Sequence, residues 1–138
     1  MIIDHICIAV KDLADAVSYW GEIFGYEQMT APVVNTRQKV KVVFLKKENS
    51  LTVKLIEPTE GNNTLKNFVE MGGGFHHICF KCDDLKEKIK ELKNKGVREL
   101  VPPQPGEAFD NKYIAFFLAK NRINFELIDT DKKANILP

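Results

Sequence analysis

Apolar and polar residues change their spacing twice along the chain, in the same order each time. Each half begins with a run rich in β-branched and aromatic residues, Ile2–Val10 and Phe75–Lys81, which has the length and composition of a strand. Apolar residues at helical spacing follow each run, after Asp12 in the first half and Asp84 in the second. This order predicts a strand and then a helix in both halves.

Three further strand patterns complete each half. They cover about 26–32, 38–46 and 51–57 in the first half, and about 97–101, 112–118 and 122–129 in the second. Turns centred on Asn49 and Asn121 join the last two strands of each set. Both halves therefore have the element order βαβββ.

The halves also match residue by residue. With an offset of 72, residues 4–25 align to 76–97 without a gap, and residues 42–56 align to 114–128. A single shared tripeptide could arise by chance, but two separated blocks on one offset indicate duplication of one supersecondary unit.

We therefore predict a single α+β domain over residues 1–138, built from tandem βαβββ modules at about 1–58 and 74–130. A short helix over Thr64–Met71, which stops at a glycine triplet, should link the modules. Pro102–Asp110 is predicted to be a loop. Ala134–Pro138 is expected to fray or to dock on a partner chain.

Composition excludes some partners. The chain has 44% hydrophobic and 28% charged residues, as in an ordinary soluble globule. Its 20 basic and 19 acidic residues are interspersed and give a net charge of +1, so no strong field favours nucleic acid or a membrane surface. The short N-terminal apolar run lacks a basic flank, and the cysteine count of three is odd, so a cytoplasmic protein without disulfides is expected.

Cys79 and Cys82 have the spacing of a redox or zinc pair. Residues three apart on a strand project from opposite faces, so the two sulfur atoms should diverge. We interpret these residues as separate buried thiols.

The three histidines lie at the starts of the two first strands. His5 and His77 are equivalent in the repeat, while His76 precedes His77. Strand alternation places His76 on the face opposite His77, so only His77 is predicted to meet His5. Hydrogen-bonded core histidines are the plain alternative, but two histidines in symmetric strand positions favour a pair of metal ligands.

Glu126 is a carboxylate within the apolar strand 123–128. If its face of the strand is buried, it needs a hydrogen-bonding partner or a cation. If its face is exposed, it is an ordinary surface acid. The repeat pairs Glu126 with Lys54.

Three blocks, Asp4–Leu13, Gly74–Leu85 and Phe125–Ile128, resemble the vicinal oxygen chelate superfamily of glyoxalases, bleomycin-resistance proteins and dioxygenases. The similarity runs from about residue 2 to 129 and is nearest to methylmalonyl-CoA epimerase and to glyoxalase I (lactoylglutathione lyase). The resemblance implies a glyoxalase-like fold, in which the two modules form a cleft-shaped mixed β-sheet with a metal ion at its centre. It also implies that a divalent metal ion such as Zn, Ni, Co, Mn or Fe is bound by His5, His77 and Glu126.

The resemblance further implies an activity. It indicates a metal-dependent, enolate-forming epimerase or isomerase for a CoA thioester, or a lyase of the lactoylglutathione type for a hemithioacetal. Glu126 would be the base and Lys54 the second acid–base group, in a homodimer that binds a small-molecule substrate. A metal-free small-molecule-binding or antibiotic-resistance protein is the alternative, and a dioxygenase is disfavoured by the shortage of histidines.

Lys54 departs from the superfamily pattern, because related epimerases and glyoxalases have a fourth ligand, Gln or Glu, at this position. An ammonium group has no lone pair and cannot bind a metal ion. We expect Lys54 to turn aside and leave a three-ligand site open to water. Alternatively, Lys54 pairs with Glu126 in place of the metal, or donates a proton to an oxyanion. The strand 38–45 also lacks the second carboxylate expected of epimerases.

Overall fold

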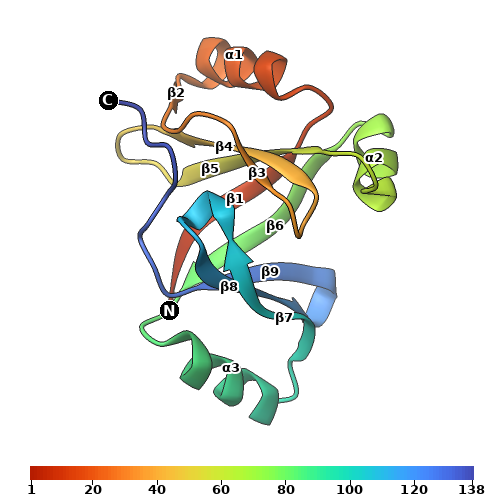
Figure 1. Cartoon of the computed structure of the whole chain (residues 1–138), viewed down its shortest axis with the longest axis vertical. Helices are drawn as coiled ribbons and strands as arrows, with labels where there is room; N and C mark the ends of the chain where they lie inside the picture. Colours follow the sequence, from red (N-terminus) through yellow and green to blue (C-terminus); the bar gives the residue numbers. More distant parts are fainter.

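The computed structural model describes all 138 residues, which form strands, α-helices and two 3₁₀ turns (Figure 1). The strands are β1 (Ile2–Ala9), β2 (Glu27–Gln28), β3 (Val33–Asn35), β4 (Val40–Lys46), β5 (Thr52–Pro58), β6 (Gly74–Lys81), β7 (Arg98–Gly106), β8 (Lys112–Ala119) and β9 (Ile123–Ile128). The helices are α1 (Leu13–Phe24), α2 (Asn63–Glu70) and α3 (Leu85–Asn94), and the 3₁₀ turns are η1 (Glu107–Phe109) and η2 (Lys120–Arg122).

All nine strands belong to one mixed sheet, whose order shows the duplication. The order is β2-β4-β5-β1-β6-β9-β8-β7, with β3 paired to β4. In each half the first strand runs parallel to the last one, β1 to β5 and β6 to β9, and the halves meet where β1 and β6 pair antiparallel. The predicted α+β class, with tandem βαβββ units in a mixed sheet, is confirmed.

Helices α1 and α3 are equivalent and lie at opposite ends of the molecule in Figure 1. Asp12 accepts a hydrogen bond from the backbone of Asp15, and Asp84 accepts one from Glu87, so each helix starts at the predicted cap. Each helix packs its apolar face on the last two strands of its own half, α1 on β4 and β5 and α3 on β8 and β9. A third apolar cluster fills the centre, where the two halves meet.

The prediction of a loop at Pro102–Asp110 is wrong, because β7 continues to Gly106 and η1 follows it. β7 is an edge strand that pairs with β8 alone. Its pairing is irregular between Val101 and Gln104, where Pro102 and Pro103 lie, so the missing proline N–H groups interrupt no regular ladder. In the first half, the strand predicted at about 26–32 is limited to β2, and the pattern did not predict β3.

The C-terminal segment, residues 130–138, docks on its own chain, so the expectation that its end frays is wrong. Docking of its exposed Ile136 and Leu137 side chains on a partner chain stays a prediction. We call this segment the C-terminal strap. The Ala134 backbone N–H donates to the Ala108 carbonyl in the second half, and Ile136 forms a β-bridge with Thr30 in the first. In Figure 1 the strap runs along both halves.

Two other expectations concern the cysteines and the helices. Cys7, Cys79 and Cys82 are free and buried, with Cys79 in the central cluster and Cys82 in the cluster beneath α3, so the prediction of separate thiols is confirmed. No helix is both long enough and apolar enough to cross a membrane.

Candidate functional site

The four central strands, β5, β1, β6 and β9, each present one polar side chain to the centre of the sheet: Lys54, His5, His77 and Glu126. Cys7 lies opposite both Lys54 and His77 in the strand register, and Cys79 lies opposite both His5 and Glu126. Directly opposed residues in a sheet share a face. The register therefore gathers the four predicted site residues on one side of the sheet.

These side chains converge on one oxygen atom. Lys54 Nζ donates a hydrogen bond of 2.9 Å to Glu126 Oε1, and the Nε2 atoms of His5 and His77 lie 3.1 and 3.3 Å from the same oxygen. All four residues are buried, with Lys54 3% exposed and Glu126 fully enclosed. The second carboxylate oxygen, Glu126 Oε2, is buried without a hydrogen-bond partner.

Burial and charge set the protonation states. Burial favours the neutral form of Lys54, but the Glu126 charge outweighs it and raises the lysine pKa above its ordinary value. Burial would raise the pKa of Glu126, yet Lys54 and the two histidines hold that pKa well below its usual range. Burial lowers the pKa of His77 to about 3, which leaves a lone pair on one ring nitrogen at neutral pH.

The donors fit a divalent metal ion. Donor atoms of His5, His77 and Glu126 lie within 4.8 Å of one another, and two imidazoles with one carboxylate form a common ligand set. The unpartnered Glu126 Oε2 offers a lone pair that no protein group uses. Lys54 does not turn aside as expected but pairs with Glu126. A metal ion bound by the three ligands would therefore have a cationic neighbour.

His5 is oriented by residues that the sequence did not single out. Its Nδ1–H donates a 2.7 Å hydrogen bond to Asp4 Oδ2, and Lys133 Nζ of the strap donates to the same oxygen at 3.3 Å. The Lys133 ammonium lies over the rings of Phe44 and Phe109, at 5.2 and 5.4 Å. These contacts leave His5 Nε2 as the nitrogen that faces the site.

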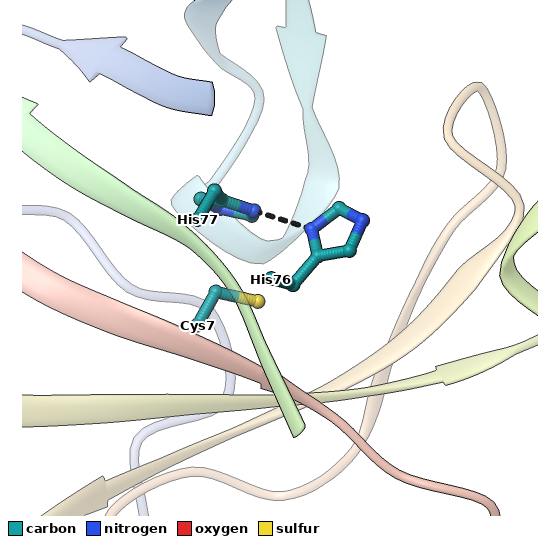
Figure 2. A group of neighbouring side chains, drawn as sticks. All are labelled: Cys7, His76 and His77. Carbon is teal, nitrogen blue, oxygen red and sulfur yellow. Dashed lines mark hydrogen bonds between the residues drawn. The ribbon is translucent and has the colours of Figure 1, made fainter. Parts of the chain in front are cut away.

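Strand alternation predicted that His76 faces away from His77, and this prediction is wrong. The pairing of β6 with β1 passes from His77 opposite Cys7 to Phe75 opposite Ile8, so His76 is an extra residue in a β-bulge. Its Nδ1 lies 2.8 Å from Nδ1 of His77, and Figure 2 shows the Cys7 sulfur beside the pair. Burial raises the pKa of Cys7 to about 12, so the thiol keeps its proton.

A cavity of about 740 Å³ opens above the site and is lined by both halves of the chain. Lys54, His76 and His77 lie in its wall, whereas Glu126 does not reach it. The lining also contains Arg37 and Arg122, which are exposed and form no ion pair. No Asp or Glu side chain lines the cavity. The remaining lining residues are Asn35, Gln38, Val40, Ile56, Asn62, Thr64, Leu65, Phe68, Phe75, Val101, Gln104, Phe116 and Asn124.

Comparison with known proteins gives consistent matches. The family model for the Glyoxalase/Bleomycin resistance protein/Dioxygenase superfamily matches residues 4–116. Mitochondrial methylmalonyl-CoA epimerase of Dictyostelium discoideum is 28% identical over 95% of this chain and 78% of its own length. The Bacillus subtilis protein YqjC is 35% identical over 83% of this chain and 80% of its own length.

A solved structure matches over nearly the same extent. A variant of Streptomyces coelicolor methylmalonyl-CoA epimerase, in complex with 2-nitronate-propionyl-CoA, superposes with a TM-score of 0.82 and 28% identity. The match covers 95% of this chain and 98% of the epimerase.

Proposed function

Because the chain belongs to the glyoxalase, bleomycin resistance and dioxygenase superfamily, we propose that it is an epimerase that acts on a substituted malonyl-CoA through an enolate. The observation that carries this proposal is the cavity wall, in which Arg37 and Arg122 have no carboxylate partner and Lys54 belongs to a buried pair with Glu126. The epimerase relatives support the same chemistry.

The cavity suits a polyanionic thioester. Its volume is within the usual range for a small-molecule site, and Arg37 and Arg122 carry guanidinium groups that no protein carboxylate neutralises. A malonyl-CoA derivative bears a carboxylate next to the reacting carbon, as well as phosphate groups. Lys54 lines the same cavity and would donate a hydrogen bond to the thioester oxygen.

His5, His77 and Glu126 would hold the divalent metal ion. When bound, the metal would supply a Lewis acid that polarises the thioester oxygen. Asp4 and Lys133 keep His5 Nε2 turned toward the site.

Lys54 and Glu126 carry the proton chemistry. An entering thioester meets the Lys54 ammonium first, because Lys54 lines the cavity and Glu126 lies behind it. The lysine turns to the thioester oxygen, which uncovers the carboxylate of Glu126. Glu126 takes the proton from the carbon between the two carbonyl groups, and the electron pair moves to the thioester oxygen. Lys54 then donates an ammonium proton, which exchanges with solvent, to the opposite face of the planar enolate, and the other epimer forms. The proton on Glu126 passes to the lysine and restores the pair.

The test is epimerisation of one isomer of methylmalonyl-CoA in D₂O, with the protein loaded with Co²⁺ or Zn²⁺. We expect inversion at the reacting carbon, seen by circular dichroism, together with uptake of one deuterium, seen by mass spectrometry. Glu126→Gln should lower kcat by at least about 100-fold, the usual effect of losing a general base. Lys54→Met should lower kcat by a similar factor, whereas Lys46→Met on the exposed end of β4 should not.

If neither methylmalonyl-CoA nor ethylmalonyl-CoA takes up deuterium in the presence of the metal-loaded protein, the epimerase proposal is wrong. The second candidate is a metal-free binding protein, which the Lys54–Glu126 pair favours because it neutralises the carboxylate without a metal ion. Tight binding of a CoA thioester, without proton exchange and without metal uptake, would identify that function.

A further inference from the structure

The bulge in β6 brings a second histidine to the wall of the cavity. Ordinary alternation would turn His76 to the far face of the sheet, but the extra residue turns it toward the cavity beside His77. β1 has an equivalent irregularity at Asp4, between Ile3 and His5. The repeat therefore places one bulged residue before each candidate histidine ligand, and each bulged residue contacts Nδ1 of that ligand.

The hydrogen bond between the two histidines contains a single proton. Nδ1 of His76 and Nδ1 of His77 are 2.8 Å apart. The dashed line in Figure 2 marks this hydrogen bond. A hydrogen bond between two ring nitrogens needs one donor and one acceptor, so one proton lies between them. The tautomer of one ring therefore dictates the tautomer of the other.

A metal ion on Nε2 of His77 would decide which ring donates. Its Nε2 lone pair would then be engaged, so the single ring proton would be on Nδ1 and would be donated to His76. The proton of His76 must then be on Nε2. That nitrogen has no hydrogen-bond partner in the protein and is not among the enclosed unpartnered atoms, while His76 lines the cavity.

From this geometry we propose that His76 is a positioning residue for His77 and that, when the site holds a metal ion, it presents an Nε2–H donor to an oxygen atom of the substrate. The inference rests on the proposed function, because it takes His77 as a ligand. A substrate carboxylate or thioester oxygen has the matching acceptor chemistry. Binding of a metal ion would therefore make His76 a hydrogen-bond donor in the cavity wall.

The equivalent residue of the first half cannot do this. Asp4 is an acceptor only, and its Oδ2 is shared between His5 and Lys133 beneath the site. Asp4 therefore fixes the orientation of His5 in every state. His76, in contrast, passes the protonation of His77 to a nitrogen that substrate can reach.

The test is a long-range ¹H–¹⁵N correlation spectrum of histidine-labelled protein, first treated with chelator and then titrated with Zn²⁺. In the zinc form we expect His77 to carry its proton on Nδ1 and His76 to carry its proton on Nε2. A zinc form in which His76 keeps its proton on Nδ1 would overturn the inference and leave the proposed function standing. Coordination of zinc by Nδ1 of His76 and the sulfur of Cys7, which lies beside both rings, would also overturn it.

Two variants separate positioning from donation. In His76→Asn the side-chain oxygen can still accept from His77, but no Nε2–H remains, so zinc affinity should stay within about threefold while KM for methylmalonyl-CoA rises about tenfold. His76→Phe fills the space without an acceptor and should weaken zinc binding by about tenfold or more. Equal zinc affinities for the Phe variant and the wild type would refute the positioning role. Failure of the wild type to bind zinc at all would refute both this inference and the proposed metal site.

Discussion

Lys54 puts a positive charge next to the three proposed metal ligands. Its ammonium lies 2.9 Å from the carboxylate oxygen that both histidines also face. Replacement of Lys54 by Gln removes this charge and supplies an amide oxygen with a free lone pair. We expect Lys54→Gln to bind Zn²⁺ about tenfold more tightly or better, as measured by isothermal titration calorimetry.

Lys54→Met is the matched control for this change. Methionine removes the charge, retains most of the side-chain length and adds no hard ligand, so any gain in zinc affinity should be smaller than for Gln. Equal affinities for the two variants would show that only the charge matters and that no fourth ligand forms. Weaker binding by Lys54→Gln than by the wild type would contradict the prediction.

At the residue scale, the sequence predicts those positions that the repeat relates. His5, His77, Lys54 and Glu126 are found by one offset, and the structure brings them together. Asp4 could have been found by the same comparison, since it precedes His5 as His76 precedes His77. Lys133 gave no such signal, because it lies outside both modules and reaches the site only through the path of the strap.

The C-terminal strap is the element that connects the chain end to the site. Lys133 is only 6% exposed at its side chain and holds Asp4, which in turn holds His5. Without Lys133, the Asp4 carboxylate is held less firmly, so it orients the His5 imidazole less well. We expect Lys133→Met to lower zinc affinity by about tenfold, measured by competition with a coloured chelator.

Lys132→Met tests whether this effect belongs to the contact or to the strap. Lys132 is the adjacent residue, is exposed and forms no side-chain hydrogen bond or ion pair. Its replacement should leave zinc affinity unchanged. A similar loss in both variants would show that docking of the strap as a whole, and not the Lys133–Asp4 contact, orients His5.

At the element scale, periodicity fails where a strand departs from regular pairing. Alternation assigns His76 to the wrong face because a bulge adds one residue that no residue in β1 opposes. Proline content suggested a loop at 102–110 because the composition cannot show that β7 is an edge strand. Both features depend on the partner strand, so no local pattern reveals them.

Across the whole molecule, the site is the place where the two modules meet. β1 and β6 join the halves of the sheet, and each half contributes one histidine and one member of the Lys54–Glu126 pair. Neither module alone contains a neutralised site, since the buried carboxylate would lose its ammonium and the ammonium its carboxylate. The ion pair therefore links folding of the halves to assembly of the site.

The buried titratable groups make this link depend on pH. Burial lowers the pKa of His77 to about 3, whereas an unfolded chain binds the same proton near pH 6.5. Between these values the unfolded state binds more protons than the folded state, so stability falls as pH falls. Glu126, whose pKa is lowered well below its usual range, acts in the same direction below about pH 4.5. The raised pKa of Lys54 weakens the fold only in strongly alkaline solution.

We expect the free energy of unfolding of chelator-treated protein to decrease by about 1.4 kcal/mol for each unit between pH 6 and pH 4.5 on account of His77. Urea unfolding at several pH values measures this slope. His77→Gln has no proton to bind in this window, so its slope should be shallower by that amount even if the variant is less stable at pH 7. Parallel slopes for the two proteins would show that His77 is not held in its neutral form by the fold.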